Sequence, residues 1–310
     1  MRILVSGSTG LIGRALCAKL EASGLHEIVR LVRPASKQVS PSAGDAGSTV
    51  RWEPASGWLD GAALRAAGPF DAVVNLAGES IASGRWSPER KERIRSSRTA
   101  STRLLVSSVA EIDESPQVFL SASAIGYYGD RGAEELSEDS GSGKGFLAEV
   151  CVAWEAEASL AAATGARVVM LRTGIVLSKD GGALAKQLPL FRIGLGGKLG
   201  SGHQYMSWIT LRDEVAAIEH ALTDPILSGA VNLVAPAPVT NAELTNALAK
   251  AVSRPAILNV PGFALAAVLG RDASSELLLA SQKVKPVRLV SAGFRFADPA
   301  LPEALAALLF

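Results

Sequence analysis

The sequence has few of the residues that build metal sites and disulfide frameworks. Its 310 residues include two cysteines and three histidines. Cys17 and Cys151 fall inside helical apolar patterns with no neighbouring partner, which is typical of buried thiols in a reducing compartment. The histidines lack zinc-ligand spacing, and no H-E-x-x-H or paired C-x-x-C motif is present. We therefore expect no disulfide and no metal.

A strong net charge and long hydrophobic runs are also missing. Basic and acidic residues nearly balance, giving a net charge of +1, which favours neither nucleic acid nor an anionic membrane as a partner. The first residues fit a core strand rather than a signal peptide, and no apolar run reaches membrane-spanning length. We expect a cytoplasmic protein, monomeric or homodimeric, that acts on a small molecule.

Short apolar runs typical of buried strands alternate with helical patterns over the first 175 residues. Strands that alternate with helices predict parallel βαβ units, hence an α/β fold with a doubly wound parallel sheet that binds its ligand at the carboxyl ends of its strands. The predicted strands are residues 1–6, 27–32, 71–76, 117–121 and 167–171, and the predicted helices are residues 11–20, 88–110 and 146–163.

A glycine-rich turn follows directly behind the first predicted strand and precedes the first predicted helix. Glycine lets the backbone approach a pyrophosphate closely or adopt positive φ, and the helix N-terminus offers unpaired N–H groups to an anion. The G-x-x-G-x-x-G spacing differs from the common G-x-G-x-x-G fingerprint, so an ordinary strand-to-helix turn is the alternative. The context favours a dinucleotide site made of Gly7, Ser8, Thr9, Gly10, Leu11, Ile12 and Gly13.

Four segments at successive strand ends, residues 7–13, 75–79, 121–129 and 171–174, carry a family resemblance. Together they resemble an extended short-chain dehydrogenase/reductase, more narrowly the epimerase-like family whose members are often labelled nucleoside-diphosphate-sugar epimerases. Residues 282–286 and 293–296 resemble that family's C-terminal extension, so the resemblance covers essentially the whole chain. It implies a Rossmann-type sheet and a nicotinamide dinucleotide, with cofactor contacts from Asn75, Leu76, Ala77, Gly78, Ser121 and Arg172 besides the glycine turn.

The end of the second predicted strand favours NADP over NAD. An acidic residue near that position would bind the ribose hydroxyls of NAD. This strand ends instead at Arg33, with Lys37 close behind, where a 2′-phosphate would find positive charge. An exposed arginine in a polar loop is the alternative.

Beyond Gly174 the pattern changes to glycine-rich loops and helices, which predicts a smaller substrate-side lobe. Residues 35–48 are rich in serine, glycine and proline and predict a surface loop. We expect an NADP-binding domain over residues 1–175 with return segments near 204–234. The resemblance implies that one of these segments is a strand over residues 204–209. The substrate-side lobe and C-terminal extension would comprise residues 176–203 and 235–310, so the two lobes are interleaved in sequence.

By resemblance, Ser123 matches the family's catalytic serine, which binds the substrate oxygen beside the nicotinamide. The chain departs from the wider superfamily at the tyrosine and lysine expected on the following helix, where Phe146 and Val150 stand. A tyrosine with its ordinary pKa of about 10 relays protons poorly at neutral pH unless a nearby ammonium stabilises its phenolate. Phenylalanine and valine can do neither task.

Three replacements for the missing pair remain open. Tyr127 or Tyr128 acts as the acid, Glu79 acts as the base, or the ordinary dehydrogenase reaction does not occur. Tyr128 packing beside the cofactor and Glu79 in a salt bridge to a following arginine are the structural alternatives.

The basic segment 85–98 contains interleaved glutamates and a proline at a helix start, which favours a solvated helix face over a nucleic-acid site. Arg98 falls on the stripe of this helix that includes Ile94 and Leu105, so it should point inward. There it would pair with Glu79 or with a substrate carboxylate or phosphate.

The residues, together with the family resemblance, favour an NADP(H)-binding, epimerase-like oxidoreductase that transfers hydride to or from a carbonyl or secondary alcohol. Ser123 would polarise the oxygen, and Tyr127 or Glu79 would carry the proton. A redox sensor or interaction protein that binds NADP(H) without turnover is the competing class, because Phe146 and Val150 replace the Tyr/Lys pair. A nucleotide-sugar epimerase is a third interpretation, although that reaction also needs a proton carrier.

Overall fold

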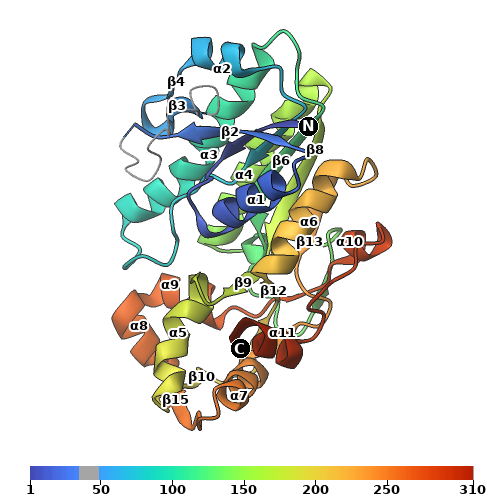
Figure 1. Cartoon of the computed structure of the whole chain (residues 1–310). Helices are drawn as coiled ribbons and strands as arrows, with labels where there is room; N and C mark the ends of the chain where they lie inside the picture. The colour runs from blue at the N-terminus through green and yellow to red at the C-terminus, as the bar shows by residue number, and fades with distance from the viewer. Residues whose placement is uncertain (35–48, 310) are drawn as a thin grey trace.

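The computed structural model describes residues 1–34 and 49–309, and its central element is an eight-stranded sheet (Figure 1). The strand order is β13-β8-β6-β5-β1-β2-β3-β4, and all neighbours are parallel except β3 and β4. The strands are β1 (Arg2–Ser6), β2 (Glu27–Val32), β3 (Thr49–Glu53), β4 (Trp58–Leu59), β5 (Ala72–Asn75), β6 (Val118–Ala124), β8 (Arg167–Thr173) and β13 (Gly229–Leu233).

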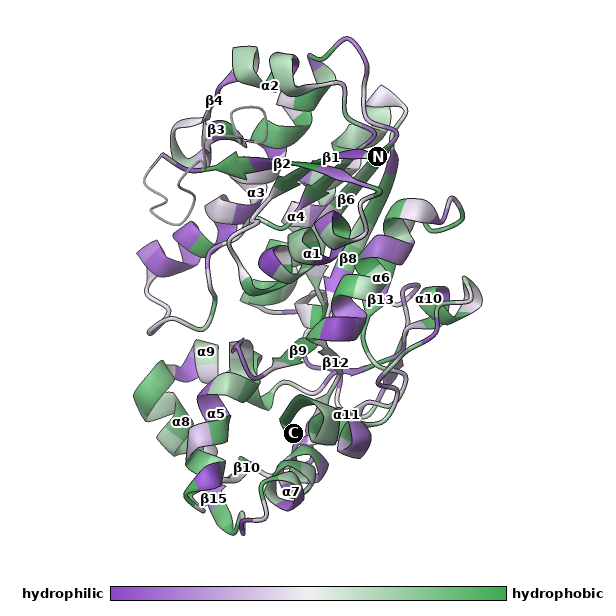
Figure 2. Cartoon of the chain, in the orientation of Figure 1, coloured by the Kyte–Doolittle hydropathy of each residue, from purple (hydrophilic) through white to green (hydrophobic). Residues whose placement is uncertain are grey.

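Helices cover both faces of the sheet, so the central strands contain continuous apolar stretches that are buried on both sides (Figure 2). Alternate residues of β1 point to opposite faces: Ile3 and Val5 pack in one core cluster, and Leu4 packs in the other. Helices α1 (Leu11–Ala22) and α6 (Leu211–Thr223) cover the first face, and α2 (Gly61–Ala67), α3 (Pro88–Ala110) and α4 (Phe146–Ser159) cover the second.

The sheet has its topological switch point at β1, which lies between β2 and β5. The chain first builds outward through β2 and then returns to the other side of β1 through β5. In open α/β sheets this reversal opens a crevice at the carboxyl ends of the strands, where ligands bind. The turns that follow β1 and β5 therefore face the expected site.

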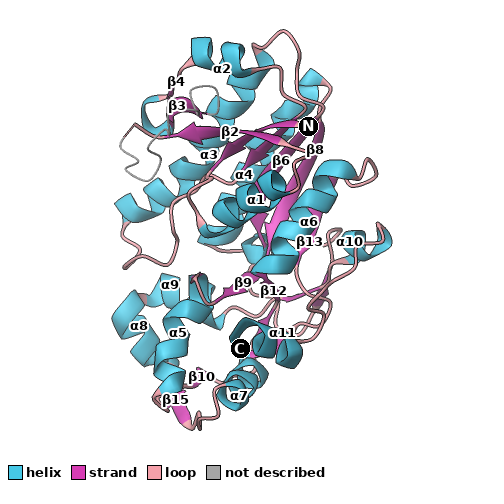
Figure 3. Cartoon of the chain, in the orientation of Figure 1, coloured by secondary structure: helices cyan, strands magenta, loops and turns pink. Residues whose placement is uncertain are grey.

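A second, smaller lobe follows the sheet and lies below it in Figure 3. Its core joins Leu184 and Leu188 to Trp208, Leu244 and Leu305. Its helices are α5 (Gly182–Arg192), α7 (Asn241–Ala251), α8 (Gly262–Leu269), α9 (Arg271–Ser274), the π-helix η4 (Ser275–Leu279) and α11 (Leu301–Leu309). Helix α10 (Val287–Ser291) instead packs against β13, and its Leu289 lies in the core of the main sheet. Short strand pairs are β7 (Glu135–Leu136) with β16 (Lys283–Val284), β9 (Ile175–Ser178) with β12 (Trp208–Thr210), β10 (Gly197–Leu199) with β15 (Leu258–Val260), and β11 (Tyr205–Met206) with β14 (Val239–Thr240).

The structure confirms most predicted elements and corrects one of them. The predicted helix over residues 88–110 is α3, and the predicted return to the main sheet is β13, which pairs with β8. Residues 204–209 do not form one strand, because β11 and β12 pair in different sheets on either side of Ser207. The Ser207 hydroxyl donates to Gln282 O (2.8 Å) and accepts from Val284 N (2.9 Å). The 35–48 segment, Lys37 included, lies outside the described residues.

The C-terminal segment is tied to the main sheet by buried carboxylates. Asp213, in the first turn of α6, accepts hydrogen bonds from the backbone N–H groups of Ala297 (2.9 Å) and Asp298 (2.8 Å). Glu138 accepts from the N–H groups of Asn232 (3.1 Å) and Arg288 (3.2 Å). These bonds join segments distant in sequence, so the C-terminal segment belongs to the folded core.

In the part of the chain that the structure describes, no helix combines the length and apolarity needed to cross a bilayer. The same residues contain no cluster of three or more histidine, cysteine, aspartate or glutamate side chains arranged to hold a metal ion.

Candidate functional site

The turn between β1 and α1 leaves no room for side chains at two of its glycines. Gly7 has φ +69°, and a Cβ there would lie 2.5 Å from Leu76 O at the end of β5. A Cβ at Gly13 would lie 2.2 Å from Gly7 O. Glycine at these positions therefore lets the turn, the first helix and the neighbouring strand end pack backbone against backbone.

This turn presents unpaired polar groups. Gly10 caps α1 without a side-chain bond, and the first N–H groups of the helix, from Leu11 onward, have no partner within it. Ser8 is buried, yet its hydroxyl bonds to no described residue. A buried hydroxyl beside free N–H groups at a helix N-terminus is a fit for a phosphate group.

Two further glycines, which sequence reasoning missed, approach the same turn from the second lobe. A Cβ at Gly181 would lie 3.2 Å from a methyl carbon of Leu11, and Gly182 has φ +72°. They occupy the turn between β9 and α5, so both lobes meet at the glycine turn. The only available signal was the Gly-Gly pair, which is weak by itself.

Asn75 lies inside the protein and ties four elements together. It is 0% exposed, and its Oδ1 accepts from Ser6 Oγ (2.6 Å) while its Nδ2 donates to Thr102 Oγ1 (2.8 Å) and, at 3.5 Å, to Ser121 Oγ. Ser121 is likewise buried. These two side chains hold the strand ends in register, whereas Leu76, Ala77 and Gly78 continue outward along the candidate crevice.

Arg33 is exposed directly after β2, the strand on the far side of β1 from β5. Its position is the one at which a dinucleotide fold meets the adenosine ribose.

Ser123, Glu155 and Arg172 form one buried chain of hydrogen bonds. Ser123 Oγ donates to Glu155 Oε1 (2.6 Å), and Arg172 binds the same carboxylate through Nε and Nη2, at 2.8 Å each. Burial lowers the pKa of Arg172, but its bonds and ion pair with Glu155 outweigh this and hold the pKa above its ordinary value. Sequence reasoning missed Glu155, because it lies on the buried face of α4 among apolar residues and no motif marks it.

The two adjacent tyrosines have different surroundings. Tyr128 is fully buried, donates to Asn232 Oδ1 (2.7 Å) and accepts from Arg172 Nη1 (3.0 Å), and burial raises its pKa. Tyr127 is half-buried, with the Arg172 guanidinium 3.5 Å from its ring centre. Its hydroxyl bonds to no described residue, so of the two phenols only Tyr127 keeps a free hydroxyl.

Glu79 forms a salt bridge to a following arginine, which was the structural alternative to a role as catalytic base. Its carboxylate binds Arg90, and Arg93 lies at 3.7 Å. Arg98 does point inward, but its Nη1 donates to Ile94 O (3.0 Å), and within the described residues it forms no ion pair. The guanidinium instead lies over the Trp154 ring, 5.2 Å from its centre.

The first turns of α4, which lie near the end of β6, carry neither tyrosine nor lysine, and Glu155 further along the helix is the carboxylate that meets Ser123. Leu147 packs against Gly126, and Cys151 lies near Ala124 O, with burial raising the pKa of its thiol to about 11. Val150 is buried, and Phe146 stacks edge-on against Trp86, 5.2 Å between ring centres. The tyrosine and lysine are therefore absent whether the motif is placed at 146 and 150 or one residue later.

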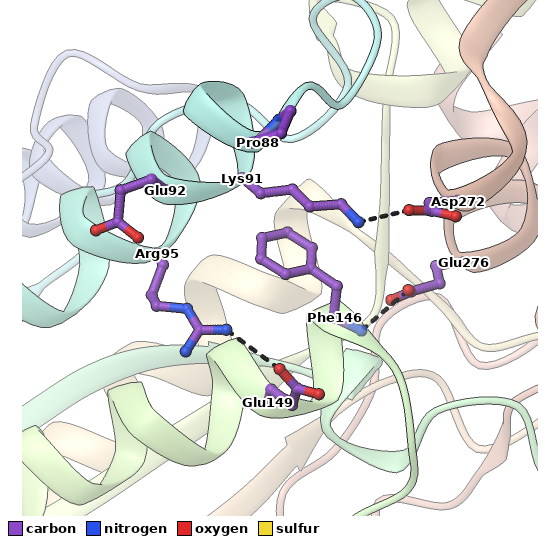
Figure 4. A pocket seen from close by; sticks show the side chains of 8 residues that line it. All are labelled: Pro88, Lys91, Glu92, Arg95, Phe146, Glu149, Asp272 and Glu276. Carbon is purple, nitrogen blue, oxygen red and sulfur yellow. Dashed lines mark hydrogen bonds and ion pairs between the residues drawn. The ribbon is translucent and has the colours of Figure 1, made fainter.

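Phe146 lines a surface pocket of about 540 Å³ between α3, α4 and the second lobe (Figure 4). Lys91 and Arg95 lie over its ring, and Lys91 also pairs with Asp272. Glu276 accepts from the N–H groups of Phe146 (3.0 Å) and Leu147 (2.8 Å), which supplies α4 with the cap that Gly145 lacks. The pocket is thus crossed by contacts that hold the two lobes together.

A fully buried carboxyl group, Glu214 of α6, lies beside the end of β8. It accepts from the Thr173 hydroxyl (2.8 Å), and its other oxygen has no partner among the described residues. Burial raises its pKa to about 8, so the group is mostly neutral at pH 7.

The parallel sheet, its switch point and the glycine turn define the class: a Rossmann-type nucleotide-binding protein. Residues 3–233 match the NAD dependent epimerase/dehydratase family, and residues 260–308 match a domain of unknown function (DUF1731). The chain belongs to the NAD dependent epimerase/dehydratase family.

Named relatives cover almost the whole chain. Epimerase family protein MT2273 of Mycobacterium tuberculosis is 45% identical over 98% of this chain and 96% of its own length. The crystal structure of human epimerase family protein SDR39U1 with NADPH has a TM-score of 0.87 and 34% identity, covering 99% of each chain. A nucleoside-diphosphate sugar epimerase structure from Corynebacterium glutamicum has a TM-score of 0.79 and 36% identity, and this chain spans 58% of its length.

Proposed function

We propose that the protein binds NADP(H) and transfers hydride to or from a carbonyl or secondary alcohol. The observation that carries the proposal is the uncapped N-terminus of α1 directly behind the glycine turn, in a turn that also holds the Ser8 hydroxyl with no partner among the described residues. Gly7 and Gly13 let this turn pack closely against the end of β5 and the start of α1. The NADPH in the crystal structure of the human relative supports the same choice of nucleotide.

The residues present suit each part of the cofactor. The glycine turn would hold the pyrophosphate, and Arg33 would meet a 2′-phosphate with a charge-assisted bond. When bound, the nicotinamide supplies or accepts a hydride. The backbone from Leu76 to Gly78 would line the crevice beneath the nucleotide, with Asn75 and Ser121 fixing its position from below.

Ser123 is the residue we place at the substrate oxygen. Its hydroxyl proton is directed to Glu155, so its oxygen is free to accept a hydrogen bond from a substrate alcohol. Arg172, bound to both Glu155 and Tyr128, would position this serine rather than contact the cofactor. Tyr127, with its free phenol, is the proton carrier we favour over Glu79, whose carboxylate is paired with Arg90.

A second function is favoured by one observation: the apolar face of α4. Leu147, Val150 and Cys151 occupy the positions where a proton relay would operate. We therefore keep as the alternative a protein that binds NADP(H) without turnover and signals the redox state of the nucleotide pool.

Nicotinamide fluorescence tests both functions in one series. Purified protein is titrated with NADPH and, separately, with NADH, and a panel of aldehydes, ketones and quinones is then added to the NADPH complex. Tight NADPH binding with carbonyl-dependent loss of fluorescence supports the oxidoreductase. Binding with no turnover across the panel favours the sensor, and failure to bind either nucleotide refutes both.

A further inference from the structure

Two arginines lie at the carboxyl edge of the sheet, and their environments differ sharply. Arg172 is saturated by Glu155, Tyr128 and the Glu138 carbonyl. Arg98 donates through Nη1 alone, to Ile94 O at 3.0 Å and, at 3.5 Å, to Ser97 Oγ. Its Nε and Nη2 donate to no described residue. Burial lowers the pKa of Arg98, as expected for a cation with too little negative charge around it.

The Arg98 guanidinium lies against the backbone that leaves β5. A Cβ at Gly78 would be 3.3 Å from Arg98 Cζ and 3.4 Å from its Nη2. Gly78 is exposed, and the backbone two residues earlier, at Leu76, contacts the glycine turn through Gly7. The free donors of Arg98 therefore lie next to an exposed glycine at the edge of the nucleotide crevice.

The neighbouring carboxylate does not neutralise this cation. Glu79 follows Gly78 directly, but its ion pair is with Arg90. The Arg98 guanidinium also lies over the Trp154 ring, and this cation–π contact uses none of its N–H donors. A fixed planar fork with unused donors suits an oxyanion such as a phosphate or a carboxylate.

We propose that Arg98 and the backbone at Gly78 form an oxyanion site for a ligand bound in this crevice. The anion would come from the cofactor's pyrophosphate or from an acidic substrate. The inference rests on the proposed function only for the identity of the ligand, because the site itself depends on the geometry of α3 and β5.

The test compares Arg98→Gln with Arg93→Gln, a matched control that removes an exposed arginine from the same helix. NADPH affinity is measured by fluorescence, and binding of inorganic pyrophosphate to the ligand-free protein is measured by calorimetry. Binding of malonate to the NADPH-saturated protein is measured in the same way. We expect Arg98→Gln to weaken at least one of these ligands about tenfold, which is the value of one charge-assisted bond, and Arg93→Gln to leave all three unchanged.

The pattern of losses identifies the source of the anion. Loss of NADPH and pyrophosphate affinity indicates the cofactor, whereas loss of malonate affinity alone indicates an acidic substrate. If wild-type protein binds pyrophosphate but no NADPH, the proposed function fails and the pyrophosphate measurement still decides the site. Equal affinities of Arg98→Gln and wild type for every ligand would overturn the inference.

A second variant separates ligand binding from folding. Gly78→Ala keeps the charge but places a Cβ against the guanidinium, so it should cause a smaller loss on the same ligand. If Arg98→Gln lowers the melting temperature and Gly78→Ala binds like wild type, the role of Arg98 is structural and the inference is refuted.

Discussion

The glycine turn after β1 and the polar chain beneath Ser123 lie at the same edge of one sheet, yet they are built in opposite ways. At the turn, backbone packs against backbone, and a buried hydroxyl and the first N–H groups of α1 have no partners in the part of the chain that the structure describes. Beneath Ser123, each charged group already has its counterpart, as in the Glu155–Arg172 pair. The first region is arranged to receive a ligand, whereas the second is arranged to hold a fixed framework.

The largest effect should come from breaking the framework. Glu155→Gln leaves the Arg172 charge buried without compensation, and we expect it to lower the free energy of unfolding by about 3 kcal/mol or more. Glu157→Gln, two residues further along α4, breaks the more exposed pair with Arg103 and should cost much less. Urea unfolding of the two variants measures the difference, and equal losses would show that the buried Glu155–Arg172 pair stabilises the fold no more than the exposed pair does.

The next largest effect should be the loss of ligand affinity when a side chain is placed in the turn. Gly13→Ala places a Cβ 2.2 Å from Gly7 O, so we expect NADPH affinity to fall about a hundredfold, with stability lowered by about 1–3 kcal/mol. Gly24→Ala is the matched control, because Gly24 has φ +67° but open space around it. It should lose some stability and keep its NADPH affinity, as fluorescence titration will show.

A third test uses pH, because Glu214 is buried and forms no ion pair with any residue that the structure describes. Its pKa is about 8 in the folded protein against 4.5 as the model value for an unperturbed glutamate, so the unfolded chain releases this proton first. Stability from this group is complete below pH 4.5 and is lost as pH rises toward 8, by at most about 1.4 kcal/mol per pH unit.

Glu214→Gln should remove this dependence, since glutamine stays neutral. Unfolding measured from pH 5 to pH 8 should then show a flatter stability profile for the variant. Glu219→Gln, on the same helix but in the more exposed pair with Lys19, should keep the wild-type slope. Parallel profiles for Glu214→Gln and wild type would show that the carboxyl group is charged in the folded protein.

The smallest effect should come from Arg33, which we place at the 2′-phosphate on the adenosine end of the nucleotide. Arg33→Ala should weaken NADPH about tenfold and leave NADH unchanged, because only NADPH carries the 2′-phosphate. Arg65→Ala, an exposed arginine on α2, serves as the control. Equal loss for both nucleotides would place Arg33 elsewhere in the site.

The sequence predicts the sheet well because buried parallel strands are continuous apolar runs, and β2 matches its predicted range of 27–32. Hydrogen bonds between polar side chains far apart in the sequence produce no comparable local pattern. Glu155 meets Ser123 across 32 residues, and Glu276 meets Phe146 across 130. The split at Ser207 was missed for the same reason, since its partners lie 75 and 77 residues away.

Because Glu276 caps α4, the N-terminal and C-terminal parts of the chain depend on each other for folding. The two family matches end at 233 and begin at 260, which invites treating residues 260–308 as a detachable module. Yet this carboxylate completes the helix that carries Glu155, and Asp213 in turn holds residues 297 and 298. Exchange of the C-terminal part between relatives would therefore succeed only when both halves of these contacts are inherited together.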